Sequence, residues 1–232
     1  MTEAETSRKD YNKRVRKIGK ILIGLILGAS LGFNWWQWQE NKNNQSGYKV
    51  KGVIDGDTLV LEGKVKIRLR SADAPELSFC GGQEAKAELE KLVSGQKVQI
   101  KEKIMDFKAR PMALVYVGEE LVNQKMIESG WAKYHSDVTS QRKNLKAAQA
   151  LAREKAIGIW SEQCRQMENK TKPQCNIKGN IDDNARGRKI YYYPGCAQYN
   201  FTVVEKDMGE EWFCSKEEAE TAGYAKSKNC RN

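Results

Sequence analysis

Four acidic residues lie close together in one part of this sequence and could hold a metal ion. Asp55 and Asp57 flank a glycine in the run Asp55-Gly56-Asp57, and Asp73 and Glu76 follow the next apolar stretch. Several carboxylate oxygens at one site suit a hard cation such as Ca²⁺. Taken alone, the Asp-Gly-Asp run is equally typical of a hairpin turn, so it does not by itself indicate a site.

Two arginines, Arg68 and Arg110, would complete such a site. The guanidinium fork matches the oxygens of a phosphate group and can bind two of them at once. A metal ion, a carboxylate that serves water and arginine clamps are together the groups that phosphodiester hydrolysis requires. The residue types therefore indicate phosphodiester chemistry, provided that the fold brings them together.

The sequence around these residues predicts an α+β domain. Short β-prone runs over residues 48–69 predict three strands joined by tight turns. The spacing of apolar residues predicts two more strands near 98–105 and 113–117, and helices over 83–94, 122–129 and 145–155. A five-stranded OB-type barrel with three helices is the natural closure for so few short strands. Such a barrel would bring the acidic residues to one end.

Taken together, the motifs of residues 48–165 resemble the thermonuclease family, which has the staphylococcal nuclease-like fold. The resemblance rests on six ordered stretches, at 54–58, 68–76, 110–113, 121–123, 130–132 and 158–160. It implies an endonuclease that cleaves DNA and RNA at the bond to the 5′ oxygen with little sequence specificity. It also implies Ca²⁺ as the cofactor, no organic cofactor and a monomer.

The resemblance assigns roles to seven positions. Two aspartates and a backbone carbonyl hold Ca²⁺, another aspartate stands behind them, a glutamate activates or positions the attacking water, and two arginines bind phosphate. The Ca²⁺ ligands match Asp57, Asp73 and the Ala74 carbonyl, and the aspartate behind them matches Asp55. The glutamate matches Glu76, and the arginines match Arg68 and Arg110. The alternative is a catalytically inactive OB-fold protein that only binds nucleic acid. Loss of the acidic and arginine set would be its signature, and the set is intact here.

This sequence also departs from the family pattern. The family often has tyrosine-glycine before the second arginine, whereas this chain has Lys108-Ala109. The tyrosines that line the nucleotide pocket have no match around Tyr134, so base preference stays open. His135 is the only histidine, and we interpret it as a polar loop residue because a lone histidine without a partner is weak evidence for catalysis.

The N-terminal part of the chain predicts a membrane anchor. Residues 1–20 carry seven cations and three acids, residues 21–33 carry no charge, and a tryptophan cluster ends at Trp38. A transmembrane signal anchor over 21–38 and a polar linker over 39–47 fit this pattern. The positive-inside rule then places the nuclease domain on the outer, periplasmic or extracellular, face of a bacterial inner membrane. The alternative is a cleaved signal peptide and a secreted protein.

Six cysteines in an exported chain can form three disulfides. Within residues 48–165 the only pair is Cys80 and Cys164, so we expect them to be bridged. A polar linker over 166–174 precedes a Cys-rich module at 175–232, which is too small to fold on apolar burial alone. For the module we expect two bridges, with Cys175–Cys214 and Cys196–Cys230 as the proposed pairs, although sequence does not determine the connectivity.

The role of the Cys-rich module stays open at this stage. It looks like a small module appended to bacterial thermonucleases and is similar to the zinc-binding module of Ada DNA-repair proteins. A four-thiolate zinc site is therefore the alternative to disulfides, although Ser227 stands where that module has one of its cysteines. We expect the active site not to need the module. The other interpretation makes it an adhesive or partner-binding module.

Overall fold

The computed structural model describes residues 47–182 and 187–230, and a compact unit begins at Gly47. The predicted anchor at 21–38, the basic segment before it and most of the linker at 39–47 lie outside the described residues. Within the described part of the chain, no helix is long and apolar enough to cross a membrane.

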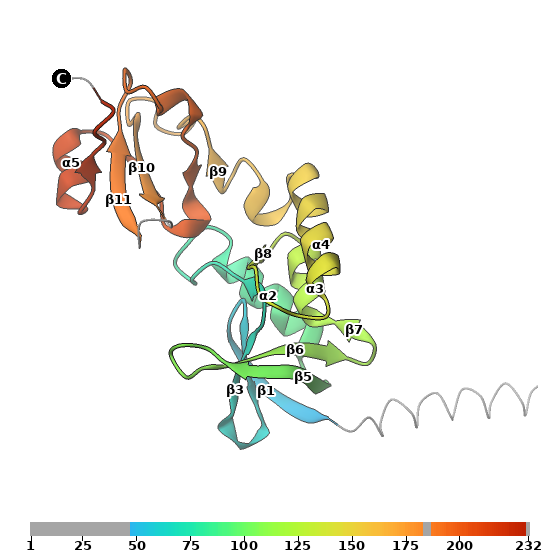
Figure 1. Cartoon of the computed structure of the whole chain (residues 1–232). Helices are drawn as coiled ribbons and strands as arrows, with labels where there is room; N and C mark the ends of the chain where they lie inside the picture. The colour runs from blue at the N-terminus through green and yellow to red at the C-terminus, as the bar shows by residue number, and fades with distance from the viewer. Residues whose placement is uncertain (1–46, 183–186, 231–232) are drawn as a thin grey trace, which may run out of the picture. The chain divides into compact units, whose positions relative to one another are not determined.

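The first half of the described chain is a closed β-barrel (Figure 1). Its strands are β1 (Tyr48–Asp55), β2 (Thr58–Leu61), β3 (Lys66–Leu69), β5 (Lys97–Met105), β6 (Pro111–Val117) and the short β7 (Glu120–Leu121). The sheet order is β3-β2-β1-β5-β6-β7, and β3 closes the barrel by pairing parallel with β6. The expected α+β fold with an OB-like sheet is confirmed.

Three helices accompany the barrel, as expected: two pack on its strands, and the third packs on one of these helices. They are α2 (Gly82–Val93), α3 (Val122–Glu128) and α4 (Arg142–Glu154). The buried residues of α2 recur every three or four positions, so that one face of the helix meets the barrel. Helix α2 packs on β1, while α3 packs on β6 and on α4 (Figure 1).

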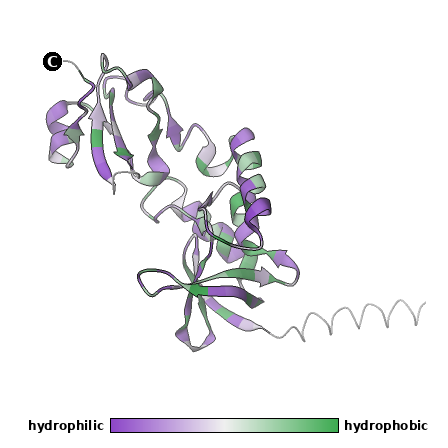
Figure 2. Cartoon of the chain, viewed as in Figure 1, coloured by the Kyte–Doolittle hydropathy of each residue, from purple (hydrophilic) through white to green (hydrophobic). Residues whose placement is uncertain are grey.

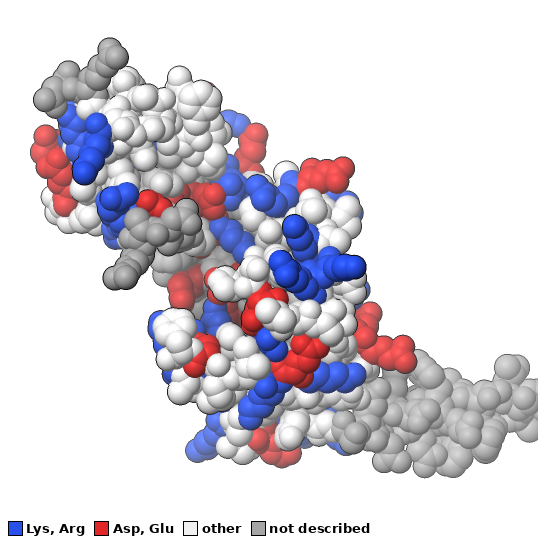
Figure 3. Space-filling view, viewed as in Figure 1, with Lys and Arg blue, Asp and Glu red and all other residues white. Residues whose placement is uncertain are grey.

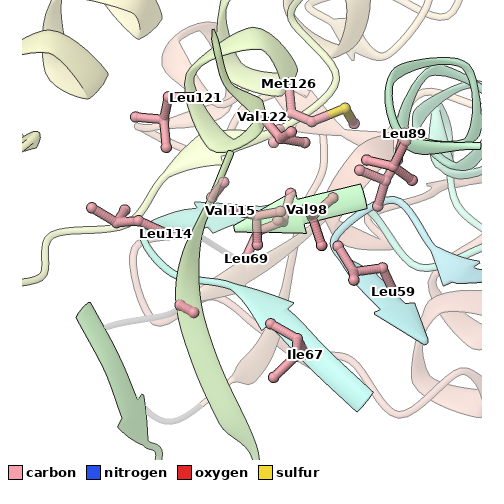
Figure 4. Close-up of a cluster of buried hydrophobic side chains, with 14 of the residues drawn as sticks. Leu59, Ile67, Leu69, Leu89, Val98, Leu114, Val115, Leu121, Val122 and Met126 are labelled. Atoms are coloured by element: carbon pink, nitrogen blue, oxygen red, sulfur yellow. The ribbon is translucent and has the colours of Figure 1, made fainter. Parts of the chain in front are cut away.

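The apolar core lies between the barrel and these helices (Figure 4). Leu59, Ile67 and Leu69 of the barrel, Leu89 of α2 and Met126 of α3 are all at most 2% exposed. Hydrophobic and hydrophilic residues follow one another along the barrel strands (Figure 2), which is the pattern of strands with one buried face. This alternation is what made the strands predictable.

Two further elements were not predicted because they are only two residues long. Strand β4 (Ala72–Asp73) pairs antiparallel with β8 (Lys133–Tyr134). The partners are Ala72 opposite Tyr134 and Asp73 opposite Lys133. A run of two residues shows no periodicity, so sequence patterns cannot reveal it. This ladder carries one of the expected metal ligands.

The C-terminal module has its own sheet and a small core. Strands β10 (Ile177–Asp182), β11 (Arg188–Tyr192), β13 (Trp212–Phe213) and β14 (Ala225–Lys226) form the order β13-β10-β11-β14 beside α5 (Lys216–Thr221). The core consists of five buried residues: Ile177, Tyr191, Phe213, Ala219 and Tyr224.

Three disulfides are present, and their pairs coincide with the expected ones. They are Cys80–Cys164 in the barrel part and Cys175–Cys214 and Cys196–Cys230 in the module. All six cysteines are used, so no free thiol remains for the zinc site that the sequence left open. Each bridge closes within its own part of the chain.

A short strand pair joins the two parts directly. Strand β9 (Arg165–Gln166), where the predicted linker begins, pairs antiparallel with β12 (Val204–Glu205) of the module. Two 3-10 turns of the module, η4 (Tyr199–Phe201) and η5 (Lys206–Met208), flank β12. The module therefore has a hydrogen-bonded contact with the barrel part beyond the covalent link.

Candidate active site

The hairpin between β1 and β2 presents the first two acidic residues. Asp55 ends β1, and Asp57 lies in the turn with 1% of its surface exposed. A Cβ atom at Gly56 would lie 2.5 Å from the Cβ of Ala85 and 2.6 Å from that of Ala74. Only glycine lets the turn come this close to α2 and to the chain after β4. The Asp-Gly-Asp run is therefore a turn, and the turn is pressed against the next acidic segment.

Asp57 ties three neighbouring segments together. Its Oδ1 accepts hydrogen bonds from the Thr58 hydroxyl (2.9 Å) and from the Arg68 guanidinium, and its Oδ2 accepts one from the Ala74 N–H (3.0 Å). Its backbone carbonyl accepts from the Leu69 N–H (2.7 Å). Burial raises the pKa of Asp57 to about 7, against the lowering effect of Arg68. A buried carboxylate of this kind is stabilised by a nearby positive charge.

Arg68 lies between the two expected aspartate ligands. It donates to Asp57 with one guanidinium nitrogen and to Asp73 with the other. Burial acts to lower the pKa of Arg68, but the two aspartates outweigh it and the pKa is raised. The guanidinium thus supplies positive charge at the point where the carboxylates converge.

The donor set fits a hard cation. Two carboxylates, Asp57 and Asp73, adjoin the Ala74 backbone, and Asp55 lies behind Asp57, accepting from its N–H at 3.2 Å. Oxygen donors of this type are what Ca²⁺ prefers. Among the described residues, no group of three or more His, Cys, Asp or Glu side chains is close enough to hold a metal ion alone. A backbone carbonyl and water would have to complete the coordination shell.

Glu76 is the remaining acidic residue of the expected set. It is exposed, in the loop after β4, and it does not line the cavity described below. A Cβ at Gly82 would lie 2.0 Å from the Glu76 carbonyl oxygen, so the loop is folded tightly back on the start of α2. The loop also contains Cys80, which is bridged to Cys164.

Arg110 is held in place by an acidic residue that the sequence analysis missed. Asp106 accepts from the Arg110 Nε (2.7 Å) and N–H (2.7 Å) and from the Lys108 N–H (2.8 Å). Burial acts to raise the pKa of Asp106, but these hydrogen bonds outweigh it and the pKa is lowered. Ala109 has a φ of 58°, a left-handed conformation that explains why the family often has glycine there.

The two arginines meet at one cavity of about 410 Å³. Its walls come from the end of β3 with β4, from the β5–β6 hairpin and from the loop after β8. The lining includes Arg68, Asp73, Arg110 and His135, together with Phe107. Phe107 is 91% exposed, so its ring is free to contact a ligand. The lone histidine is a loop residue, as expected, but it faces the cavity.

Arg70 fixes the loop that forms the third wall. Its guanidinium donates to both carboxylate oxygens of Asp137 (2.8 and 3.3 Å) and to the carbonyls of Val138 (2.6 Å) and Glu102 (3.0 Å). Arg70 is 7% exposed, so these bonds are largely shielded from water. No local sequence pattern indicates this role, because the partners of Arg70 lie far away along the chain.

Charges of both signs are interspersed on the face shown in Figure 3, in keeping with the modest positive excess of the whole sequence. Within α4, exposed Arg142, Lys143, Lys146 and Arg153 stand against one acid, Glu154. These cations and the two arginines of the cavity can attract a polyanion.

Comparison with known proteins identifies the family. Residues 66–162 match the family described as staphylococcal nuclease homologue. An uncharacterized endonuclease of Haemophilus influenzae is 34% identical over 155 residues, which cover 65% of this chain and 80% of that protein. The thermonuclease of Staphylococcus hyicus is 30% identical over 131 residues, covering 51% of this chain and 78% of that protein.

A plant protein extends the comparison. A probable staphylococcal-like nuclease of Oryza sativa subsp. japonica is 30% identical over 118 residues, covering 51% of this chain and 31% of that longer protein. The chain described here belongs to the staphylococcal nuclease family. Its homologues indicate a nuclease, that is, a hydrolase of nucleic acid.

Proposed function

We propose that the protein is a Ca²⁺-dependent endonuclease that hydrolyses phosphodiester bonds of DNA and RNA with little sequence specificity. The observation that carries the proposal is the convergence of Arg68, Arg110 and Asp73 on one cavity, with buried Asp57 directly behind Arg68. An inactive binding protein would not need the buried carboxylate of Asp57 beside Arg68, because such burial costs stability.

Three groups of this chain are proposed to hold the ion. Asp57 and Asp73 would bind through their carboxylates and Ala74 through its backbone carbonyl, with Asp55 behind them. Bound Ca²⁺ would supply charge that polarises a phosphoryl oxygen and orients water. The burial of Asp57 and the oxygen-rich donor set support this assignment.

The arginines are proposed to bind the scissile phosphate. Both line the cavity, and each is held by carboxylates, Arg68 by Asp57 and Asp73 and Arg110 by Asp106. Preorganised donors stabilise the charge that develops on the phosphate oxygens in the transition state. Glu76 is proposed to hold the attacking water, which requires its exposed side chain to turn toward the bound phosphate.

The cavity also supports cleavage of nucleic acid with little dependence on its base sequence. Phe107 is an exposed ring beside the phosphate-binding arginines, and every base has a flat face that can stack on it. Stacking of this kind favours unpaired nucleotides without reading their identity. We therefore propose single-stranded or locally opened nucleic acid as the preferred substrate form.

The decisive experiment compares three variants of the full chain on single-stranded DNA. Wild type should cleave in Ca²⁺ and stop when the ion is chelated. Arg110→Ala and Glu76→Gln should each lose about 100-fold or more in kcat, the usual effect of removing one group that stabilises the transition state. Arg142→Ala, an exposed arginine of α4 that does not line the cavity, is the matched control and should keep kcat near the wild-type value.

Cleavage at the wild-type rate by Arg110→Ala and Glu76→Gln would reject this proposal. Retained binding of nucleic acid without cleavage in the wild type would instead favour the inactive OB-fold protein.

We further propose an anchor at 21–38 that places the nuclease part on the outer face of a bacterial inner membrane. The three disulfides support an oxidising location, since such bridges form and persist mainly outside the cytoplasm. The charge pattern of residues 1–38 supports an anchor inserted with its N-terminus inside.

A further inference from the structure

A partly buried cluster of charges lies where the Cys-rich module meets the nuclease part. Lys133 of β8 places its Nζ 2.8 Å from Glu205 and 2.7 Å from Asp207. Arg165 of β9 lies 2.7 Å from the other oxygen of Glu205. The Asp207 side chain is only 1% exposed. Two cations of the nuclease part thus pair with two acids of the module.

This pairing matters energetically because Asp207 is shielded from water and Glu205 is partly buried. Burial acts to raise the pKa of both acids, and Lys133 acts to lower it. The pKa of Glu205 is lowered because the effect of the cations exceeds that of burial. The pKa of Asp207 is raised because the effect of burial exceeds that of Lys133. Removing the cation from a buried ion pair leaves an uncompensated charge, which costs more than the pair itself contributes. Lys133 is therefore held firmly where it is.

Lys133 is also the direct neighbour of a proposed metal ligand. It lies opposite Asp73 in the β4–β8 ladder, which consists of two residue pairs only. So short a ladder cannot fix its own position. Its position depends on what holds β8 from outside. Lys133 is bound to the module, and the Tyr134 N–H donates to Gln149 of α4 at 2.7 Å.

The same part of the module holds the loop that carries Glu76. The backbone N–H of Lys206 donates to the Cys164 carbonyl (2.8 Å), and its carbonyl accepts from the Cys80 N–H (3.2 Å). The Lys206 backbone is thus hydrogen-bonded to the backbones of both cysteines of one disulfide. A Cβ at Gly209 would lie 2.6 Å from the Phe79 ring, so this ring packs directly on the glycine.

We infer that residues 205–209 of the Cys-rich module, here called the brace, position the active site, with Lys133 as the positioning residue that connects the brace to Asp73. The inference rests on the proposed Ca²⁺-dependent function. It departs from the expectation that the active site does not need the module. The brace reaches the site at two points, the β4–β8 ladder and the loop after Glu76.

The test compares Lys133→Met with Arg165→Met in the full chain. Each removes one cation from Glu205, but only Lys133 lies in the strand that pairs with Asp73. Ca²⁺ binding is measured by calorimetry without nucleic acid, and kcat and KM are measured separately. Lys133→Met should weaken Ca²⁺ binding about tenfold and lower kcat more than it raises KM. Arg165→Met should change Ca²⁺ binding less than about twofold.

Two further variants secure the test against a simple loss of folding. Lys133→Arg keeps the charge and should restore Ca²⁺ binding to near the wild-type level. Asp207→Asn removes the partner from the module side and should weaken Ca²⁺ binding as Lys133→Met does. Circular dichroism at the assay temperature shows which variants are folded.

Three outcomes would overturn the brace. Wild-type Ca²⁺ affinity in folded Lys133→Met and Asp207→Asn would show that the ion pair only docks the module. An equal loss in Arg165→Met would mean that any loosening of the junction has the same effect. A wild type that neither binds Ca²⁺ nor cleaves DNA would refute the proposed function and the brace with it. This third outcome is distinguishable from the first two because it is seen in the wild type, whereas they are seen only in the variants.

Discussion

Replacing Asn123 with alanine should weaken the barrel where β3 leaves β6. Asn123 is fully buried at the start of α3. Its Oδ1 accepts from the Val115 N–H (2.9 Å), and its Nδ2 donates to the carbonyls of Arg70 (2.8 Å) and Ala113 (3.1 Å). The side-chain amide thus bridges the backbones of Arg70 and β6 one residue beyond the end of β3, where the β3–β6 ladder has ended.

The expected loss follows from which groups remain unpaired. The Ala113 carbonyl keeps the Arg70 N–H as a partner at 2.8 Å. In Asn123→Ala, the Val115 N–H and the Arg70 carbonyl lose the bonds that Asn123 supplies. An unsatisfied buried polar group costs about 1–3 kcal/mol, so two of them should lower the free energy of unfolding by about 4 kcal/mol. That is a large part of the roughly 5–15 kcal/mol that holds a typical domain together.

Urea unfolding followed by tryptophan fluorescence measures this loss. With a slope of about 2 kcal/mol per molar urea, the midpoint should fall by about 2 M. Gln124→Ala is the matched control on the same helix, because its amide bonds only to Glu128 at the partly exposed surface. It should change the free energy of unfolding by about 0.5 kcal/mol or less. If Asn123→Ala shifts the midpoint no further than Gln124→Ala does, the ladder argument is wrong.

Two other predictions concern the substrate and the location. Phe107→Ala should raise KM for single-stranded oligonucleotides about 5- to 150-fold, from a stacking contribution of about 1–3 kcal/mol, and leave thermal stability unchanged because the ring is 91% exposed. Phe201→Ala, 83% exposed on the module, is the control and should leave KM unchanged. Protease added to intact spheroplasts should digest the nuclease part; its protection would disprove the outward topology, and a mature chain that lacks residues 1–38 would favour the cleaved signal peptide.

The barrel and its helices could be predicted because their signals are local. Apolar residues alternate along the strands, and they recur every three or four residues along α2. Glycines with positive φ, such as Gly63 in the turn after β2 and Gly130 after α3, mark where elements end. The β4–β8 ladder has no such signal. Its two pairs form only because tertiary contacts hold both strands.

The candidate site was partly predictable for a related reason. Motif resemblance pointed to Asp57, Asp73 and Arg68, and the structure brings these three together, while their roles stay predictions. Asp106 lies only four positions before Arg110 and could have been found as a turn residue that binds backbone N–H groups. The pairing of Lys133 with Asp207 joins residues far apart in sequence, and no local pattern encodes it.

The brace can position the β4–β8 ladder and the loop after Glu76 only if it is more rigid than they are. The module that contains the brace is made rigid by cross-links. Its apolar core has five buried side chains, too few to support a domain of this size. Its two disulfides span 39 and 34 residues. Loop-closure entropy predicts that each bridge stabilises the module by about 4 kcal/mol. Residues 205–209 therefore belong to a unit made rigid by covalent bonds. They contact a two-pair ladder that is too short to be rigid by itself, and a loop that the Cys80–Cys164 bridge also holds.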